Sequence, residues 1–462
     1  MKKLLSILFF LCNVQILVSS QQNQNLIAAL ELASQLPQST SSSFLDTMKG
    51  LWSSITGPSQ QSTSSAFANK VKGLWNLGAY GDAQGRVTEF ITDINQLMQM
   101  RPDLEFGLPG IPSLSKLRPT DPLLGQIKYA PFTDDTHMSL YVAHALLQAK
   151  NQSISIFLDH LVNNFLNWRN ADQQYRAPGI NSMNQTVTLQ NLKNHGKTNV
   201  NLWSRGLLSS INIDKSNDGL RKELWNSEGG CGAVMRVAPT SIMFKDNPAL
   251  AEQAAVAQGI LTHTNSGSRA ACAGFNAALL AIFHNKPLPD IWNAAITAAQ
   301  KYDTRNYSQP YDPQTYHYGT NHFSKNGCAA MCQQALKYAN DSKKPYREVL
   351  DEFRGWGATE SLAATLYIFA TWNHDPYFAM TVAINRTPGD SDSIAEMVGQ
   401  LLGAQYGYDG IVENFKKHDM NFDTELGYLE NINNLKEYPK DFPKFVELDI
   451  KTFNDLARVM SK

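Results

Sequence analysis

Hydrophobic residues recur every three or four positions along most of the chain between residues 67 and 408. The clearest runs lie at 157–168, 362–369 and 394–402. This spacing is the period of an α-helix that buries one of its faces. The alternation typical of a half-buried strand is weak and confined to stretches such as 186–189. The pattern therefore predicts a mostly α-helical domain.

Small residues lie on the packed faces of many of these predicted helices, which lets neighbouring helix backbones approach closely. Examples are Ala277, Ala278, Ala363, Ala364 and Gly403. Two polar stretches rich in Asn and Tyr, 171–228 and 303–326, interrupt the helical pattern. We expect them to be long insertions on the surface.

The start of the chain has the pattern of a secretory signal peptide. Lys2 and Lys3 precede the apolar run 4–18, and small residues end the segment 1–20. The apolar run is too short to favour a membrane-spanning helix, which needs about 20 apolar residues. We therefore expect cleavage after Ser20, a secreted or periplasmic protein, and no membrane association after cleavage.

The rest of the chain divides into two predicted parts. Residues 21–68 are rich in Ser and Gln and are expected to form a poorly ordered arm with short helices. The arm contains a local duplication, because the pattern of segment 39–52 recurs at 62–75. Residues 69–462 are expected to form one catalytic domain that includes a C-terminal extension.

Composition narrows the class of protein. Hydrophobic residues make up 43% of the chain and charged residues 18%, which excludes a mainly disordered protein. The 40 Lys and Arg residues balance 41 Asp and Glu residues, for a net charge of -1. A protein whose main partner is nucleic acid usually has a basic excess, so that function is disfavoured. We expect a monomer.

The cysteines leave two alternatives open. Removal of the signal peptide would leave Cys231, Cys272, Cys328 and Cys332. In an oxidising compartment they could form two disulfides in any of three pairings. Cys328 and Cys332 share one face if that stretch is helical, and the simpler interpretation of this pair is two buried thiols, which pack like small apolar side chains.

Two short acidic segments carry the strongest chemical signal. Residues 133–136 read Thr-Asp-Asp-Thr and residues 389–393 read Gly-Asp-Ser-Asp-Ser, each at the start of a predicted helix. Either segment alone is more simply a helix cap. Together, and with Glu89 behind the glycine-flanked turn 81–85, they favour a site that binds two divalent cations through oxygen ligands.

A glycine-rich segment is a second candidate. Residues 229–236 lack large side chains at their start, so their backbone N–H groups could face a diphosphate. The segment matches neither the Walker pattern nor the dinucleotide fingerprint, and a plain tight turn is the alternative. The pair 262–263 is Thr-His, in which the imidazole is either structural or in contact with phosphate or ribose.

In this order, these motifs resemble those of the ADP-ribosylglycohydrolase family, over roughly residues 70 to 408. The family motifs are G-D-x-x-G with a following Glu, T-D-D-T, a glycine-rich loop ending M-R-x-x-P, T-H, and G-D-[ST]-D-[ST]. The corresponding segments are 81–89, 133–136, 230–239, 262–263 and 389–393.

The resemblance implies an all-α fold, a single large orthogonal helical bundle with loop insertions, and a binuclear magnesium centre, with manganese in some members. The implied metal ligands are Thr133, Asp134, Asp135, Asp390, Asp392 and Ser393. The implied substrate-binding residues are Gly230, Gly232, Ala233, Met235 and His263.

The implied reaction is hydrolysis of the glycosidic bond between ADP-ribose and an acceptor, in an ADP-ribosylated protein or a small molecule that contains ADP-ribose. Such a reaction needs charge stabilisation at the anomeric carbon, an activated water and protonation of the leaving group. Asp134 and Glu89 are both candidates for proton transfer, and the sequence does not choose between them.

Two departures from the family pattern bear on the site. Cys231 stands where many members have Asn, and Pro388 where Gly is common. Two other functions stay open: a relative that binds ADP-ribose without catalysis, and a different two-metal hydrolase such as a phosphodiesterase. The pair His374-Asp375 superficially suggests the latter, although a turn explains it better.

Overall fold

The computed structural model describes residues 60–100, 132–150, 152–170, 229–263, 265–303, 327–341, 343–429 and 450–462. The predicted signal peptide, most of the predicted arm, the strand-like stretch 186–189 and the predicted insertions (apart from Asp303) lie outside these ranges. The chain divides into two units, Met1–Ala66 and Phe67–Lys462. Only residues 60–66 of the first unit are described, and helix α4 begins there.

The described residues fold almost entirely into helices, so the predicted all-α class is confirmed. The α-helices are α4 (Gln60–Gly85), α5 (Ile94–Met100), α7 (Asp134–Gln148), α8 (Ile154–Asn170), α12 (Ala238–Met243), α13 (Pro248–Ile260), α14 (Ser266–Phe283), α15 (Leu288–Gln300), α16 (Cys328–Asn340), α17 (Tyr346–Glu352), α18 (Ala358–Trp372), α19 (Pro376–Asn385), α20 (Ser391–Lys416), α21 (Phe422–Leu426) and α22 (Phe453–Met460). The described residues also form a 3-10 turn, η5, over Cys231–Ala233. In the described part of the chain, the one extended pairing is a bridge between Gly230 and Gly357.

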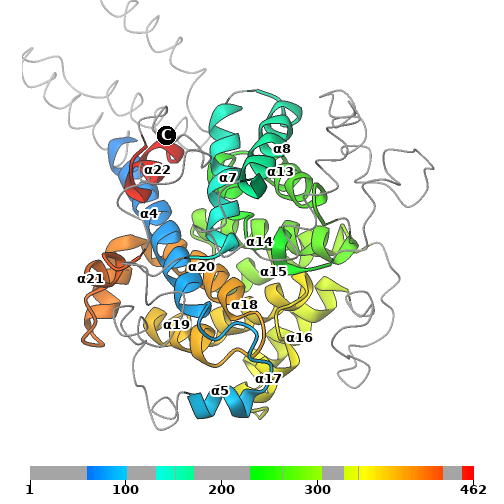
Figure 1. Cartoon of the computed structure of the whole chain (residues 1–462), viewed down its shortest axis with the longest axis vertical. Coiled ribbons are helices and arrows are strands. Elements are labelled where there is room, and N and C mark those ends of the chain that lie inside the picture. The colour runs from blue at the N-terminus through cyan, green and yellow to red at the C-terminus, as the bar shows by residue number, and fades with distance from the viewer. Residues whose placement is uncertain are drawn as a thin grey trace, which may run out of the picture. The chain divides into compact units, whose positions relative to one another are not determined.

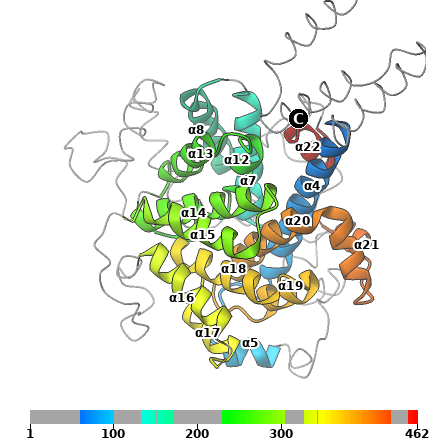
Figure 2. The same ribbon diagram turned by 180° about the vertical axis from the view of Figure 1, so that it is seen from behind.

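The helices of the second unit pack in pairs around one core. Helices α14 and α15 run side by side across the middle, α7, α8 and α13 lie on one side of them, and α16 to α19 on the other (Figures 1 and 2). The three predicted hydrophobic runs lie in α8, α18 and α20, and their apolar side chains are buried. The largest buried side chains include Trp168, Trp292, Phe275 and Phe369.

Helices α4 and α20 cross in direct backbone contact. A Cβ atom added to Gly73 would lie 2.4 Å from the Gly403 carbonyl oxygen, and one on Gly81 would lie 2.4 Å from that of Ala395. A Cβ on Gly85 would lie 2.6 Å from the Cα of Asp392. No side chain fits at these positions, so glycine is required for the approach. The contact places the end of α4 against the start of α20.

Helix α20 is interrupted near its middle. Gly407 has a φ of 69° and a ψ of 169°, which is not helical, and L side chains rarely adopt a φ in this region. A Cβ at this position would also lie 2.6 Å from Nδ2 of Asn69 in α4. The turns on either side of Gly407 therefore follow different directions.

The C-terminal part of the described chain consists of the short helices α21 and α22. Phe453 of α22 stacks on Trp75 of α4, with the two ring centroids 5.7 Å apart. None of the helices in the described ranges is both long and apolar enough to cross a bilayer.

The four described cysteines are free thiols. Cys272, Cys328 and Cys332 are buried, and Cys231 is partly exposed. Cys328 and Cys332 lie one turn apart on the same face of α16. Three buried thiols and one partly exposed thiol, rather than disulfides, are therefore present among the described residues.

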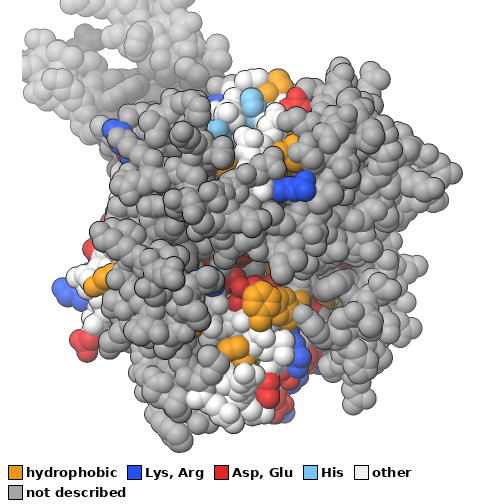
Figure 3. Space-filling model, in the orientation of Figure 1, with side chains coloured by type: hydrophobic (Ala, Val, Ile, Leu, Met, Phe, Trp, Pro, Cys, Tyr) orange, Lys and Arg blue, Asp and Glu red, His pale blue; other side chains and the backbone are white. Residues whose placement is uncertain are grey.

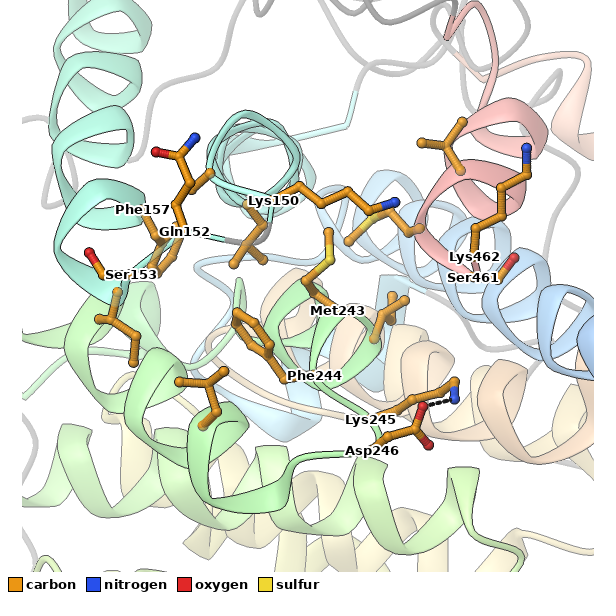
Figure 4. A pocket seen from close by; sticks show the side chains of 17 residues that line it. Lys150, Gln152, Ser153, Phe157, Met243, Phe244, Lys245, Asp246, Ser461 and Lys462 are labelled. Carbon is orange, nitrogen blue, oxygen red and sulfur yellow. Dashed lines mark hydrogen bonds and ion pairs between the residues drawn. The ribbon is translucent and has the colours of Figure 1, made fainter. Parts of the chain in front are cut away.

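A cavity of about 510 Å³ lies where α7, α12 and α22 end (Figure 4). Its walls combine the apolar side chains of Phe157, Met243 and Phe244 with the polar side chains of Lys150 and Ser461. The cavity adjoins the C-terminal end of α7, whereas the acidic segment of that helix is at its first turn. None of the predicted site residues lines it.

We expect Gly403→Ala to lower the free energy of unfolding by about 2 kcal/mol or more, because its Cβ would lie 2.3 Å from backbone atoms of Gly73. Gly410→Ala in the same helix is the matched control, since its added Cβ meets only Tyr406 side-chain atoms, at 3.2 Å or more. The control should change stability by no more than ~1 kcal/mol. Equal stability of the two variants in chemical denaturation would contradict the close crossing.

Candidate functional site

The first acidic segment begins helix α7. Thr133 caps the helix, because its side-chain oxygen accepts a hydrogen bond from the Asp135 N–H at 3.3 Å. The Thr133 hydroxyl in turn donates to Oδ2 of Asp135 at 3.0 Å. Asp134 and Asp135 are both buried in the first turn. A cap alone does not require buried carboxylates, so this segment does more than begin a helix.

Asp82 of α4 holds this helix start in place. Its carboxylate accepts the Thr133 N–H at 2.9 and 3.0 Å, the Thr136 N–H at 3.1 Å and the Thr136 hydroxyl at 2.6 Å. Asp82 is fully buried. Asp82 lies in one of the sequence motifs but was not among the predicted site residues. The sequence signal that could have identified Asp82 is its position between Gly81 and Gly85, which are both needed at the α4–α20 contact.

The second acidic segment begins helix α20. Gly389 has a φ of 98°, and a Cβ there would lie 2.3 Å from the carbonyl oxygen of Arg354. The next residue, Asp390, donates its backbone N–H to the same oxygen at 2.9 Å. Asp392 accepts the N–H of Ser393 at 3.0 Å in the first turn. The glycine thus permits the tight approach that sets the direction of these carboxylates.

The two acidic segments meet directly. The Ser393 hydroxyl donates to Oδ1 of Asp135 at 2.6 Å, although the two residues are 258 positions apart in the chain. Ser391 points elsewhere. Its hydroxyl donates to the Gly85 carbonyl oxygen at 2.8 Å, and it lies 3.0 Å from the Thr88 hydroxyl. Of the two serine hydroxyls in the motif, only that of Ser393 therefore faces the carboxylates.

Glu89 joins these residues from the turn that follows α4. Its backbone N–H donates to the Gly85 carbonyl oxygen at 3.0 Å, and its side chain is hydrogen-bonded to Asp392. Burial, with Asp390 and Asp134 nearby, raises the pKa of Glu89 to about 9. We call the five side chains of Glu89, Asp134, Asp135, Asp390 and Asp392 the acidic cluster.

The members of the acidic cluster oppose each other's ionisation. Burial is the main cause that raises the pKa of Asp135 well above its usual value, and the neighbouring carboxylates add to it. Burial is also the main cause that raises the pKa of Asp392, and among the neighbouring carboxylates Glu89 has the largest effect. Like charges this close are stabilised only by protons or by a cation between them.

The glycine-rich segment lies against the acidic cluster. Cys231 donates its thiol to Oδ2 of Asp390 at 2.7 Å, and its sulfur lies 3.5 Å from the Ser393 hydroxyl. The sulfur of Met235 lies 3.9 Å from the same hydroxyl. Burial and Asp390 raise the pKa of the Cys231 thiol. The third predicted motif therefore belongs to the same site as the two acidic segments.

The glycine-rich segment offers fewer N–H groups than the sequence suggested. The Cys231 N–H donates to the Trp356 carbonyl oxygen at 3.2 Å, and those of Val234 and Met235 donate to the Cys231 carbonyl oxygen. The first N–H groups of a helical turn have no acceptor within the turn. In η5 this leaves Gly232 and Ala233 as the donors that can face a ligand.

His263 lies behind this turn, three residues beyond the end of α13. Its ring is buried, and a Cβ added to Gly230 would lie 3.6 Å from its Nε2. Burial and the nearby Arg236 lower the pKa of His263 to about 3, so the ring is neutral. Arg236 is completely buried, and the sequence analysis did not select it as a site residue.

An aromatic pair borders the site. Phe90 is 68% exposed, has a φ of 69° and stacks on Trp356 with ring centroids 5.3 Å apart. Its N–H donates to the Gly389 carbonyl oxygen at 3.0 Å, and the Gly389 N–H donates to that of Ile91 at 2.8 Å. On the face in Figure 3, acidic side chains adjoin a hydrophobic patch among the described residues.

Glu360 supports the same border from α18. Its carboxylate accepts the Gly357 N–H at 3.1 Å, which is the half of a capping box that the third helical residue supplies. Burial raises the pKa of Glu360 to about 8. The spacing of Gly357 and Glu360 is that of a capping box, although Gly occupies the position where Ser or Thr is usual.

The His374-Asp375 pair has a structural explanation. Asp375 caps α19 by accepting the Phe378 N–H at 3.3 Å, and it contacts Nε2 of His418 at 3.1 Å. His374 is exposed. The turn that the sequence favoured is therefore what the structure contains.

The donor set of the acidic cluster suits a hard divalent cation, because carboxylate and hydroxyl oxygens are the ligands that Mg²⁺ prefers. In the described ranges, no three His, Cys, Asp or Glu side chains are arranged to hold a metal ion. Instead, Asp135 bonds to Thr133 and Ser393, and Asp390 bonds to Cys231. The donor atoms of these residues suit a metal ion. To bind it, the side chains must give up these hydrogen bonds and contact the metal instead.

Comparison with known proteins identifies the family. The sequence model of the ADP-ribosylglycohydrolase family matches residues 63–435. A search of curated proteins found no match. A solved structure titled "ADP-ribosylglycohydrolase-related protein complex" is similar over 86% of this chain and 98% of its own, with 19% identity and a TM-score of 0.46. Because the family match spans most of the sequence, this chain belongs to the ADP-ribosylglycohydrolase family.

Proposed function

We propose that this protein hydrolyses the glycosidic bond between ADP-ribose and an acceptor, with two magnesium ions, or manganese, held by the acidic cluster. Its substrate would be an ADP-ribosylated protein or a small molecule that carries ADP-ribose, linked through nitrogen or oxygen. The observation that carries the proposal is the contact between Ser393 and Asp135, which joins two distant acidic segments at 2.6 Å. We further propose that the protein acts as a monomer, secreted or periplasmic, after loss of residues 1–20.

The metal ligands in this proposal come from the first turns of two helices. Thr133, Asp134 and Asp135 would contribute from α7, and Asp390, Asp392 and Ser393 from α20. Two divalent cations at this site would stabilise charge at the reacting centre and lower the pKa of a bound water.

Proton transfer to the leaving group falls to Glu89 or Asp134. Both belong to the acidic cluster, and the pKa of Glu89 is already raised by burial and by Asp390 and Asp134. A carboxyl group that keeps its proton near neutral pH is suited to act as a general acid. Glu89 lies outside a helix, whereas Asp134 is fixed in the first turn of α7.

The diphosphate of ADP-ribose would bind beside the acidic cluster, at the turn η5. The N–H groups of Gly232 and Ala233 begin a helical turn, where anions are favoured. Gly230 and Met235 would border the ligand, and the neutral ring of His263 lies next to Gly230. Figure 3 shows the acidic side chains beside the hydrophobic patch on one face of the molecule.

We expect Asp392→Asn to reduce release of ADP-ribose from an ADP-ribosylated peptide by at least about 100-fold, with Mg²⁺ present. The amide keeps the shape of Asp392 but removes one charge from the acidic cluster. Asp290→Asn, an exposed aspartate in the first turn of α15, is the matched control and should retain full activity. The assay is product separation by chromatography.

Three results would decide between the open functions. Mg²⁺-dependent release by Asp392→Asn at the wild-type rate would exclude the proposed metal site. Binding of ADP-ribose by the wild-type protein without any release from peptides would favour the non-catalytic alternative. Release of AMP instead of ADP-ribose would indicate a phosphodiesterase.

We expect the stability of the metal-free protein to fall as the pH rises, because folding raises the pKa of Glu89 from 4.5 to about 9. Between these values the folded protein binds more protons than the unfolded chain, so higher pH favours unfolding. The melting temperature in a chelator should drop by at least ~3 °C from about pH 5.5 to about pH 8.5. Added Mg²⁺ should stabilise the protein more at the higher pH, and Glu89→Gln should weaken the pH dependence. A flat or rising profile in chelator would contradict this picture of the acidic cluster.

A further inference from the structure

Arg236 is a buried cation that holds two parts of the substrate-binding region together. Its Nε donates to the side-chain oxygen of Gln258 at 2.7 Å, and its guanidinium stacks over the ring of Phe165 at 4.5 Å. The side-chain nitrogen of Gln258 donates to the Ala233 carbonyl oxygen at 2.8 Å, within the turn η5. None of the ion pairs found in the described ranges includes Arg236. The guanidinium is therefore bound by neutral groups that lead to the glycine-rich turn.

A second path leads from the same guanidinium to His263. Arg236 donates through one terminal nitrogen to the Thr262 hydroxyl oxygen at 2.6 Å, and that oxygen lies 2.8 Å from Nδ1 of His263. A guanidinium carries only donors, so the Thr262 oxygen must accept this bond. Burial lowers the pKa of Arg236 to about 10, so the side chain remains charged at neutral pH.

The direction of the bond between Thr262 and His263 follows from this charge. A donor that is positively charged withdraws electrons from the Thr262 oxygen, which makes the hydroxyl a stronger donor and a weaker acceptor. This effect favours the arrangement in which the Thr262 O–H points to Nδ1 of His263 and Nδ1 accepts. Because the ring is neutral and carries one proton, that proton lies on Nε2.

We propose that Arg236, acting through Thr262, fixes His263 as the neutral tautomer with its proton on Nε2, so that the ring donates a hydrogen bond beside Gly230 to the diphosphate or ribose of the ligand. Arg236 is then a positioning residue that touches no substrate, and it orients both His263 and the turn η5. The identity of the ligand rests on the proposed function, whereas the tautomer does not.

The tautomer is tested on the ligand-free protein by ¹⁵N NMR of the imidazole nitrogens at about pH 7.5, where a histidine of ordinary pKa is mostly neutral. Comparison with His263→Gln assigns its signals among the 10 histidines of the chain. We expect a protonated Nε2 and an accepting Nδ1 in the wild-type protein and in Thr262→Ser. Thr262→Val removes the hydroxyl and should redistribute the proton between the two nitrogens.

The role in binding is tested by calorimetry with ADP-ribose as the probe. We expect Thr262→Val to weaken binding about fivefold, the scale of one net hydrogen bond, and Thr262→Ser to restore it. Arg236→Lys keeps the positive charge but replaces the planar guanidinium, which donates to both Gln258 and Thr262, with a single ammonium group. This variant should therefore also change the imidazole signals of His263.

A wild-type spectrum with the proton on Nδ1, or a Thr262→Val spectrum identical to wild type, would overturn the proposal. A changed tautomer with unchanged affinity for ADP-ribose would overturn the role in ligand binding. If the wild-type protein fails to bind ADP-ribose, the proposed function and this role fail together, while the ligand-free spectrum decides the tautomer independently.

Discussion

The crossing of α4 and α20 without intervening side chains is the constraint on which the rest of the site depends. Gly73 and Gly403 bring the two backbones into contact, and Gly85 rests against Asp392 at the end of the same crossing. Glu89 follows α4 directly, so its distance from Asp392 is set by packing of the helix backbones rather than by flexible side chains. Groups that must act together on one ligand need this kind of rigid support.

Hydrogen bonds of buried polar side chains hold the other parts of the site in place. Asp82 fixes the start of α7 through its four hydrogen bonds, and Arg236 connects the glycine-rich turn to His263. Both are fully buried charges that meet no ligand atom in this scheme. Buried charges are costly unless each is well bonded, and their hydrogen bonds explain how the fold accommodates them. The site thus consists of helix starts held by polar side chains from neighbouring helices.

Much of the helical fold and the acidic residues were predictable, because both depend on local pattern. Apolar spacing identifies α8, α18 and α20, and paired aspartates before a helix can be read directly from the sequence. The roles of Asp82 and Arg236 were not predictable in this way, since they depend on partners brought near only by folding. The hydrogen bonding of the glycine-rich segment was not predictable for the same reason: the Trp356 carbonyl oxygen, more than a hundred residues away in the chain, accepts one of its N–H groups.

The interruption of α20 at Gly407 has a mechanical consequence. A continuous rod would transmit any shift of its far end to the turn that contains Asp392. Because the backbone changes direction at Gly407 and packs there against Asn69, the turns beyond it do not continue the axis of the turns that contain Asp392. A shift near Lys416 would therefore reach the carboxylates through side-chain packing, such as that of Phe415 on Tyr80 of α4, rather than along one straight helix.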